Sequence, residues 1–560
     1  MASFVRISVL SWADILATFA MYLMMTYLTN VWNLSTTHAA GIINIWNGIT
    51  PVLAIIFAFF VDEFIGDFNM LVLSSISYSI GLGLLTMSTP PVFGPCSDYK
   101  EKCIGYTQKV LFYTALPLIA VGMAGHLASF SPFLDLQTKR EHEEGADESS
   151  KKFWQIMGLM MVVVVPYVAG FAVQIIKPWS IRFGIPAICT LVATVIFLSG
   201  FREYRHINPG GSPLKTTLRV FVATARNISR PNPNPEQLNN EEDARLTNSL
   251  SCLNKAAIKL PEEQQSKKWK VCSVHEVEDT KICIRMVRMW LAFIVIGMVL
   301  SIGNTYFLEQ ANHMDHKLGK IKVPTIIFLL FHSFTRSICA SLYSYFTKRL
   351  ANKKYVPPVG IATSMVFSVL CCITAAKVET RRLDRIRDNG LLDKPDATIP
   401  MSIFALLPQF MLLAAVDGIG NRSINSFFMH QTPQSMHKYL GYFTKGVLGL
   451  GSMASVLSVY IVGKVSERNQ KPNWFQFSLN RSHLDRYYWV LAALSAANIL
   501  VYIIIALFYK YKEPPTHADA YDDDEDEDED EYEEDEVEED DEEDEAEDED
   551  DSKNHSKCCC

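Results

Sequence analysis

A histidine and an arginine lie four residues apart inside a strongly apolar segment. The segment is VPTIIFLLFHSFTRSICASLYSYF, residues 323–346, and it contains His332 and Arg336. On a helix, side chains at positions i and i+4 share one face. A charge in the hydrocarbon core of a membrane costs from ~3 to over 10 kcal/mol unless it faces water or a partner. Arg336, whose guanidinium fits a carboxylate, is therefore either a substrate or gating contact or the partner of an acid such as Asp14 or Asp417.

A second apolar segment carries polar residues toward its end. It reads PMSIFALLPQFMLLAAVDGIGNRSINSFFMHQTPQ, residues 400–434, and contains Asp417, Arg422 and Asn425. Asp417 and Arg422 lie about one and a half helical turns apart, so they do not have to face the same way. We interpret the segment as a membrane helix that carries these groups into a cavity. The alternative is that both charges lie at the level of the lipid headgroups.

Asp14 and His126 are a third pair of candidates, on two other apolar segments. A buried Asp14 remains able to take up a proton, and a histidine can do so near neutral pH. Alternatively, Asp14 is an acid at a helix entrance and His126 is a hydrogen-bonded packing residue.

Patterns typical of enzymes are not found. The sequence has no phosphate-binding loop, no zinc-ligand spacing and no nucleophile elbow. We therefore expect no enzymatic activity, no cofactor and no bound metal. The expected partners are a small-molecule solute and the lipid bilayer, with no nucleic acid.

The elements that must position these residues are long apolar helices. Of 560 residues, 49% are hydrophobic and 20% charged, which is apolar for a soluble chain of this length. A helix needs about 20 mostly apolar residues to cross the hydrocarbon core. Twelve segments fit: 8–30, 40–61, 69–88, 108–134, 153–176, 183–201, 286–308, 323–346, 357–376, 399–421, 440–463 and 485–509. The predicted fold class is an all-α membrane protein with twelve transmembrane helices.

The twelve segments divide six and six around a polar segment. We expect an N-terminal six-helix bundle at 1–203, a cytoplasmic linker at 204–284, a C-terminal six-helix bundle at 285–512 and a disordered acidic cytoplasmic tail at 513–560. Two six-helix bundles that bind substrate between them near the membrane midplane form the major facilitator fold. This plan places both termini in the cytoplasm.

The charges agree with this orientation except in one loop. Residues 519–551 include 28 acids, and without residues 519–560 the body has 49 Lys and Arg against 33 Asp and Glu. The linker is basic, which favours a cytoplasmic location. The loop after 357–376 is also basic but is predicted to lie outside; its cations are Lys377, Arg381, Arg382, Arg385 and Arg387. The acidic tail is a solubilising or sorting segment, or it docks on the basic linker in a salt-sensitive way.

Several motifs resemble one transporter family. They are PMSIF, LLPQF and the pair Phe427 and Phe428 in the tenth predicted helix, Trp46, Gly48, Asp62 and Gly66 in and after the second, RFGIPA at 182–187 and VETRRL at 378–383. In this order and spacing they are similar to the plant nitrate/peptide transporters, the proton-dependent oligopeptide branch of the major facilitator superfamily. The resemblance covers nearly all of residues 8–512. It implies alternating-access transport of a small solute.

The sequence departs from this family where proton coupling resides. Alignment on the FAMY motif places Asp14, Ala17 and Thr18 at the family's Glu, Glu and Arg positions, so one carboxylate remains. Leu127 replaces the lysine of the fourth helix, and Ser426 replaces the glutamate of the tenth. Because these charge partners are lost together, none is left buried and unpaired. We infer that the usual proton-coupling circuit is absent.

Other departures concern gating and substrate. Asp67 occupies the basic position of the loop after the second helix, which puts the family's closing ion pair in doubt, or it is simply a solvated acid. Leu300 occupies the position of the histidine that nitrate-transporting relatives use, which disfavours nitrate by that route. His332 and Arg336 lie where the family is ordinarily apolar, so a larger zwitterionic or carboxylate-bearing solute fits better.

The predicted function is secondary-active or facilitative transport of a small organic solute by alternating access. We expect a solute that bears a carboxylate or resembles an amino acid or peptide, for example a metal chelator such as nicotianamine. The alternatives are a nitrate or other anion transporter, and a transport-inactive membrane sensor or scaffold that signals through the tail. The expected location is the plasma membrane or an endomembrane of the vacuole or secretory vesicles.

The predicted site has two groups of residues. The substrate-binding residues are Asp14, Thr18, Tyr22, His126, Asn304, His332, Arg336, Gln409, Asn425 and Ser426. The gating residues are Asp62, Asp67, Asp417 and Arg422.

Overall fold

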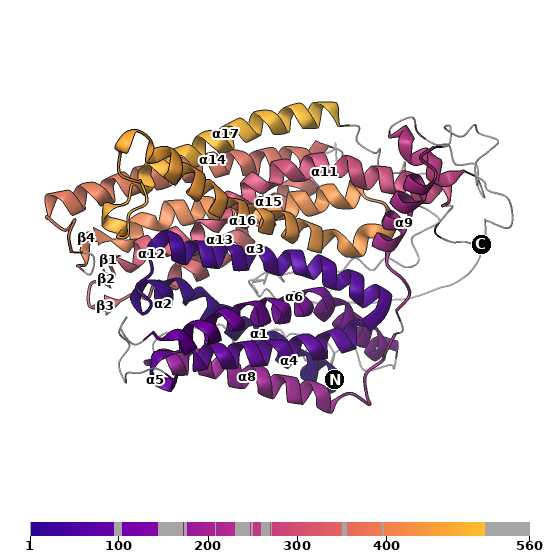
Figure 1. The fold of residues 1–560 in the computed structure, drawn as a ribbon, viewed down its shortest axis with the longest axis horizontal. Coiled ribbons are helices and arrows are strands. Elements are labelled where there is room, and N and C mark those ends of the chain that lie inside the picture. Colours follow the sequence, from indigo (N-terminus) through magenta and orange to yellow (C-terminus); the bar gives the residue numbers. More distant parts are fainter. Residues whose placement is uncertain are drawn as a thin grey trace, which may run out of the picture. The chain divides into compact units, whose positions relative to one another are not determined.

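Long helices run side by side through the computed structural model (Figure 1). The short strands lie at one end of these helices and helix α9 at the other, and we call these the strand end and the linker end. The structure describes residues 2–93, 104–143, 168, 172, 176–207, 209–229, 247, 250–258, 269, 272–349, 355–394 and 397–509. The acidic tail and its predicted contact with the linker lie outside these residues.

The first half of the chain supplies one group of helices. Its elements are α1 (Ala2–Tyr22), α2 (Met24–Asn30), α3 (Thr36–Phe60), the π-helical turn η1 (Val61–Ile65), α4 (Asp67–Met87), α5 (Pro90–Phe93), α6 (Tyr106–Glu143) and α8 (Trp179–Ser199). Ser35 caps α3, because its hydroxyl accepts a hydrogen bond from the backbone N–H of His38. Apart from residues 168, 172 and 176, the predicted helix at 153–176 lies outside the described residues.

The second half follows the linker elements α9 (Pro213–Arg226) and η4 (Ser251–Ala257). Its helices are α11 (Val274–Ser301), η5 (Gly303–Phe307), α12 (Leu308–Asn312), α13 (Ile327–Lys348), α14 (Val356–Asp388), η7 (Ile403–Leu406), α15 (Leu407–Gln431), η8 (Gln434–Tyr439), α16 (Leu440–Ser466), η9 (Arg468–Gln470), η10 (Leu479–Arg481) and α17 (Leu484–Phe508). Strand β1 (Met314–Asp315) pairs in parallel with β4 (Ile399–Ser402), and β2 (Lys317–Leu318) pairs antiparallel with β3 (Ile321–Lys322).

Ten helical spans of the described residues are long and apolar enough to cross a membrane. Helix α13 matches the predicted segment 323–346 but is not among the ten, since polar residues such as His332 and Arg336 lower its mean hydropathy. Together with α13, eleven of the twelve predicted segments are helical within the described part of the chain. The prediction of an all-α membrane protein is confirmed.

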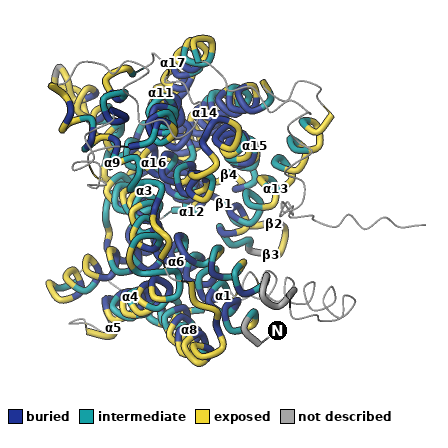
Figure 2. The backbone as a smooth tube through the Cα atoms, turned by 90° about the vertical axis from the view of Figure 1, so that its right-hand side faces the viewer, coloured by how far each residue is buried: buried dark blue, intermediate teal, exposed yellow. Residues whose placement is uncertain are grey.

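Helices α3 and α16 form the seam between the two halves. Figure 2 shows α1, α4, α6 and α8 in one group and α11, α14, α15 and α17 in the other. Helix α3 packs against α6 on its own side and against α16 on the other. A Cβ atom on Gly48 would lie 2.6 Å from the backbone oxygen of Gly449, so glycine is required for the backbones to approach this closely.

A fully buried ion pair fixes the second group at the strand end. Arg382 donates to both carboxylate oxygens of Glu379, at 2.7 and 2.8 Å, and both side chains have no exposed surface. Arg382 also donates to Asn480 at 3.2 Å, and Gln310 donates to Glu379 at 2.6 Å. The network ties α12, α14 and η10 together. It continues to Gln409 of α15, which donates to Gln310 at 3.2 Å.

This network explains the basic segment that the charge distribution did not fit. Lys377 to Arg387 do not form a loop, because α14 continues to Asp388. A helix of 33 residues is about 50 Å long, longer than the hydrocarbon core of a membrane. Arg382 is neutralised by Glu379, and Arg387 pairs with Asp384 at 3.2 Å. These cations therefore carry less information about orientation than their number indicates.

We predict that Arg382→Met lowers the stability of the protein strongly. It leaves Glu379 buried without its cation, and breaking a buried ion pair costs about 3–5 kcal/mol. The double variant Glu379→Met/Arg382→Met removes both charges and should melt at a higher temperature than the single variant. The apparent melting temperature in detergent tests this, with Arg387→Met, at an exposed pair, as the control. A single variant that melts like the wild type contradicts the role of the pair.

Candidate functional site

Two neighbouring cavities lie between the two groups of helices. The first, of about 200 Å³, is lined by Thr18, Met21, Tyr22, Met24, Ile42, Ile43, Trp46, Asn47, Leu116, Met123 and Asn304. The second, of about 180 Å³, is lined by Ser11, Asp14, Ile15, Thr18, Phe19, Tyr22, Leu329, Leu330 and Ser333. They share Thr18 and Tyr22, and each has walls from both halves of the chain. Four predicted substrate-binding residues thus line these cavities: Asp14, Thr18, Tyr22 and Asn304.

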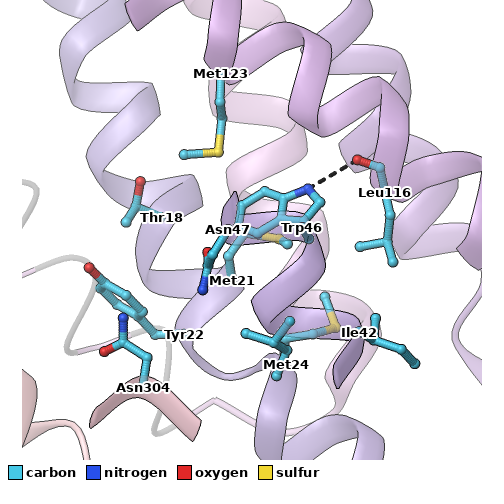
Figure 3. Close-up of a pocket in the computed structure, with 11 residues that line it drawn as sticks. Thr18, Met21, Tyr22, Met24, Ile42, Trp46, Asn47, Leu116, Met123 and Asn304 are labelled. Atoms are coloured by element: carbon cyan, nitrogen blue, oxygen red, sulfur yellow. Dashed lines mark hydrogen bonds between the residues drawn. The ribbon is translucent and has the colours of Figure 1, made fainter. Parts of the chain in front are cut away.

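The second half of the chain lines the first cavity through Asn304. Asn304 lies in the π-helical turn η5 and its side chain lies close to Tyr22 (Figure 3). On the opposite side, the indole of Trp46 donates to the backbone oxygen of Leu116 at 3.1 Å, which fixes the ring between α3 and α6. Single π-helical turns within α-helices frequently occur at functional sites. The cavity combines apolar walls with a few amide and hydroxyl groups.

Asp14, His126 and Ser75 form a hydrogen-bonded chain beside the second cavity. His126 Nδ1 lies 2.8 Å from both carboxylate oxygens of Asp14, and its Nε2 lies 2.7 Å from Ser75 Oγ. His126 and Ser75 are buried, whereas Asp14 reaches the cavity. The structure thus joins two residues that the sequence predicted separately. Ser75 had no motif to mark it, because it is one of several serines on the apolar helix α4.

A second polar cluster joins α13 to α15. Arg336 Nη1 lies 3.9 Å and His332 Nε2 lies 4.0 Å from Asp417 Oδ2. Asn421 donates a hydrogen bond to the same carboxylate. At 3.9 Å the guanidinium makes no hydrogen bond to Asp417, and 49% of its side chain is exposed. Arg336 therefore keeps hydrogen-bond donors for another partner, with Asp417 as its electrostatic neighbour.

The position of this cluster corrects the predicted helix at 399–421. Residues 399–402 form strand β4, and the helix begins at Leu407 and ends at Gln431. Proline at the first helical positions lacks only an N–H that the helix does not use, so Pro408 is compatible with this start. Asp417 consequently lies near the middle of α15 and not on its last turns.

The remaining predicted residues of α15 have individual partners. Arg422 Nε donates to Ser344 Oγ on α13 at 3.1 Å, and Asn425 Oδ1 accepts from Thr444 on α16 at 2.6 Å. The Ser426 carbonyl accepts from His430 at 2.6 Å. Gln409 is fully buried in the Glu379 network. Like His332, Arg336, Asn425 and Ser426, it lines neither cavity.

Asp62 connects the two halves at the linker end. Lys438 Nζ donates to Asp62 Oδ1 at 2.5 Å, and the hydroxyl of Tyr439 donates to Asp62 Oδ2 at 2.6 Å. Tyr439 also lies 2.7 Å from Ser212 Oγ at the start of the linker helix. Asp67, which occupies the family's basic position, is the first residue of α4. An acid at this position cannot pair with Asp62. The cation comes from the other half of the chain, at a position that the sequence motifs did not mark.

A second set of contacts connects the halves at the strand end. Asn312 donates to Thr26 Oγ1 at 2.9 Å, and Thr29 donates to the buried carboxylate of Glu309 at 3.4 Å. Apolar side chains of α2 and η5 belong to one shared cluster around these polar groups. The cavities between the halves are therefore bounded by contacts at both ends.

This architecture defines a membrane carrier with two cavities between two bundles of helices. The sequence model described as the POT family matches residues 68–475, and the chain belongs to this family. Its fold is that of the major facilitator transporters, as the solved structures below show.

Similar proteins and solved structures agree with this family assignment. Protein NRT1/ PTR FAMILY 5.5 of Arabidopsis thaliana is 38% identical over 520 residues, covering 90% of this chain and 96% of the relative. Protein NRT1/ PTR FAMILY 5.6 of the same plant is 30% identical over 513 residues, covering 87% of each chain. The crystal structure of the POT family transporter PepTSo has a TM-score of 0.59 at 15% identity, covering 90% of this chain and 97% of that one. An auto-inhibited POT family peptide transporter has a TM-score of 0.60 at 14% identity, covering 92% and 99%.

We predict that Asp62→Asn opens the linker end. The change removes the charge that holds Lys438, so the distance between the halves should increase at this end. Spin labels at Phe201 and Met429, in a variant without its native cysteines, measure that distance by double electron–electron resonance. The population with longer distances should grow in Asp62→Asn and stay unchanged in the control Asp384→Asn. An unchanged distribution in Asp62→Asn contradicts a gating role.

Proposed function

We propose that this chain is a secondary-active or facilitative transporter of a small organic solute that bears a carboxylate or resembles an amino acid or peptide. The observation that carries the proposal is Arg336, a half-exposed guanidinium near the middle of α13 without a hydrogen bond to its nearest acid. An arginine at this depth requires a cavity or an anionic partner, and its donors match the two oxygens of a carboxylate.

Alternating access supplies the mechanism. The cavities have walls from both halves, and contacts hold the halves together at either end. A carrier that opens one end at a time breaks the Asp62 contacts with Lys438 and Tyr439 on one side, and the Asn312 contact with Thr26 on the other. These contacts are short and polar, so each is replaceable by water when its end opens.

We propose that transport does not use the family's usual proton circuit. Asp14 is held by His126, which Ser75 contacts in turn, and it has no cation from the other half among the described contacts. Its proton is therefore not exchanged against a guanidinium or ammonium when the halves move. Leu300 contributes to apolar packing, which supports an organic solute over nitrate bound by a histidine at that position.

We place the protein in the plasma membrane or an endomembrane, with both termini in the cytoplasm. The ten apolar helical spans of the described residues support a membrane location. The basic linker supports the cytoplasmic side for the termini. In this orientation the linker end is cytoplasmic, and the Asp62 contacts form the cytoplasmic gate.

We predict that Arg336→Ala abolishes solute uptake without unfolding the protein. Losing a charge-assisted contact to the solute costs about 2–5 kcal/mol, so uptake should fall by roughly 30-fold or more. The measurement is uptake into liposomes containing purified protein, screened with amino acids, short peptides, nicotianamine and nitrate. Arg349→Ala, at the exposed end of the same helix, is the matched control. Full uptake by Arg336→Ala at an unchanged melting temperature would contradict the assignment of Arg336 as a contact of the solute.

We also predict that an imposed proton gradient changes the uptake of the identified solute little. The same liposomes, loaded at one pH and diluted into another, measure this directly. Asp14→Asn should show the same weak dependence on the gradient, whatever its rate of uptake. Strong proton-driven accumulation that disappears in Asp14→Asn would overturn the proposed lack of coupling.

A further inference from the structure

The linker helix α9 starts beside the contacts of Asp62. Gly211, just before the helix, donates its backbone N–H to the backbone oxygen of Asp62 at 3.0 Å. The φ angle of Gly211 is 99°, in the left-handed region that glycine adopts without steric cost. Ser212 then caps the helix, because its hydroxyl accepts a hydrogen bond from the N–H of Leu214 at 3.3 Å. The turn into α9 is therefore built directly against the π-helical turn η1 of the first half.

The first turn of α9 contacts both halves of the chain. Glu63 of η1 accepts a hydrogen bond from the backbone N–H of Ser212 at 3.4 Å and forms an ion pair with Lys215. The Ser212 hydroxyl lies 2.7 Å from the hydroxyl of Tyr439, which belongs to the second half. Because Tyr439 donates its own proton to Asp62, Ser212 is the donor in this contact. One short segment thus joins the acids of η1 to the tyrosine on the opposite side of the gate.

The later turns of α9 are anchored on the second half. Val220 and Ala223 are fully buried in an apolar cluster that includes the start of α11. Arg219 forms an ion pair with Glu276 in the first turn of α11. In the first turn of α9, by contrast, Lys215 keeps 44% of its side chain exposed. Water replaces such polar contacts more readily than it replaces buried apolar ones, so the first turn is the part of α9 that can release.

We propose that α9 is a strap that holds the linker end closed, and that its contacts with Glu63 and Tyr439 are released each time this end opens. The inference rests on the proposed function for its part in transport. Glu63, Ser212 and Lys215 are then gate residues in addition to Asp62. The strap stays on α11 and moves with the second half. Weakening its first turn therefore favours the state that is open at the linker end.

The test measures the distance between spin labels at Phe201 and Met429 by double electron–electron resonance, in the cysteine-free background. In Lys215→Met the ratio of open to closed populations should rise about threefold or more, because Glu63 loses its cation. Glu63→Gln should have the same effect. The double variant should open no further than either single variant, since all three lack the same ion pair. Arg226→Met, at an exposed arginine on the last turn of α9, is the matched control and should keep the wild-type distances.

Two results would overturn the strap. One is an unchanged distance distribution in either single variant, and the other is an effect that adds up in the double variant. The liposome assay separates this failure from that of the proposed function. A chain that transports its solute while Lys215→Met keeps the wild-type distances refutes the strap and leaves transport intact. Opening in both single variants, in a chain that moves no solute, supports the strap and refutes transport.

Discussion

The cost of placing a charge in hydrocarbon governs this structure. Each ionised group within the membrane-spanning helices must have a partner or reach water. Glu379 and Arg382 satisfy the requirement completely, with two short hydrogen bonds and no exposed surface. Arg336 satisfies it differently, because it remains half exposed and too far from Asp417 for a hydrogen bond. The first pair holds the bundle together, and the second group is available for a ligand.

The same constraint accounts for the changes on the first helix. A chain that lacks the arginine and lysine of its family's central cavity must also lack their acids, or it leaves charges buried alone. Here the one retained carboxylate, Asp14, is bound by His126 within the same half. Positive charge is found instead in the second half, where Arg336 of α13 lies 3.9 Å from Asp417. We therefore propose that substrate recognition and proton coupling are separated in this chain.

Hydrophobic periodicity was sufficient for the helices and insufficient for the contacts between them. Apolar runs located eleven described helices, but the start of α15 was placed too early because residues 399–402 are apolar and nevertheless form a strand. Asp14 and His126 were recognised singly, since spacing along a sequence says nothing of the packing between distant helices. Lys438 was missed because a lysine near a helix end is ordinary in a membrane protein. Only the fold shows that it meets Asp62.

The most direct test of this account is a cryo-electron microscopy structure in a lipid nanodisc with the transported solute bound. The account predicts density for the anionic group of the solute within hydrogen-bonding distance of the Arg336 guanidinium, in a chamber between the two bundles. A guanidinium that points into lipid headgroups, or a solute bound without contact to Arg336, would contradict it.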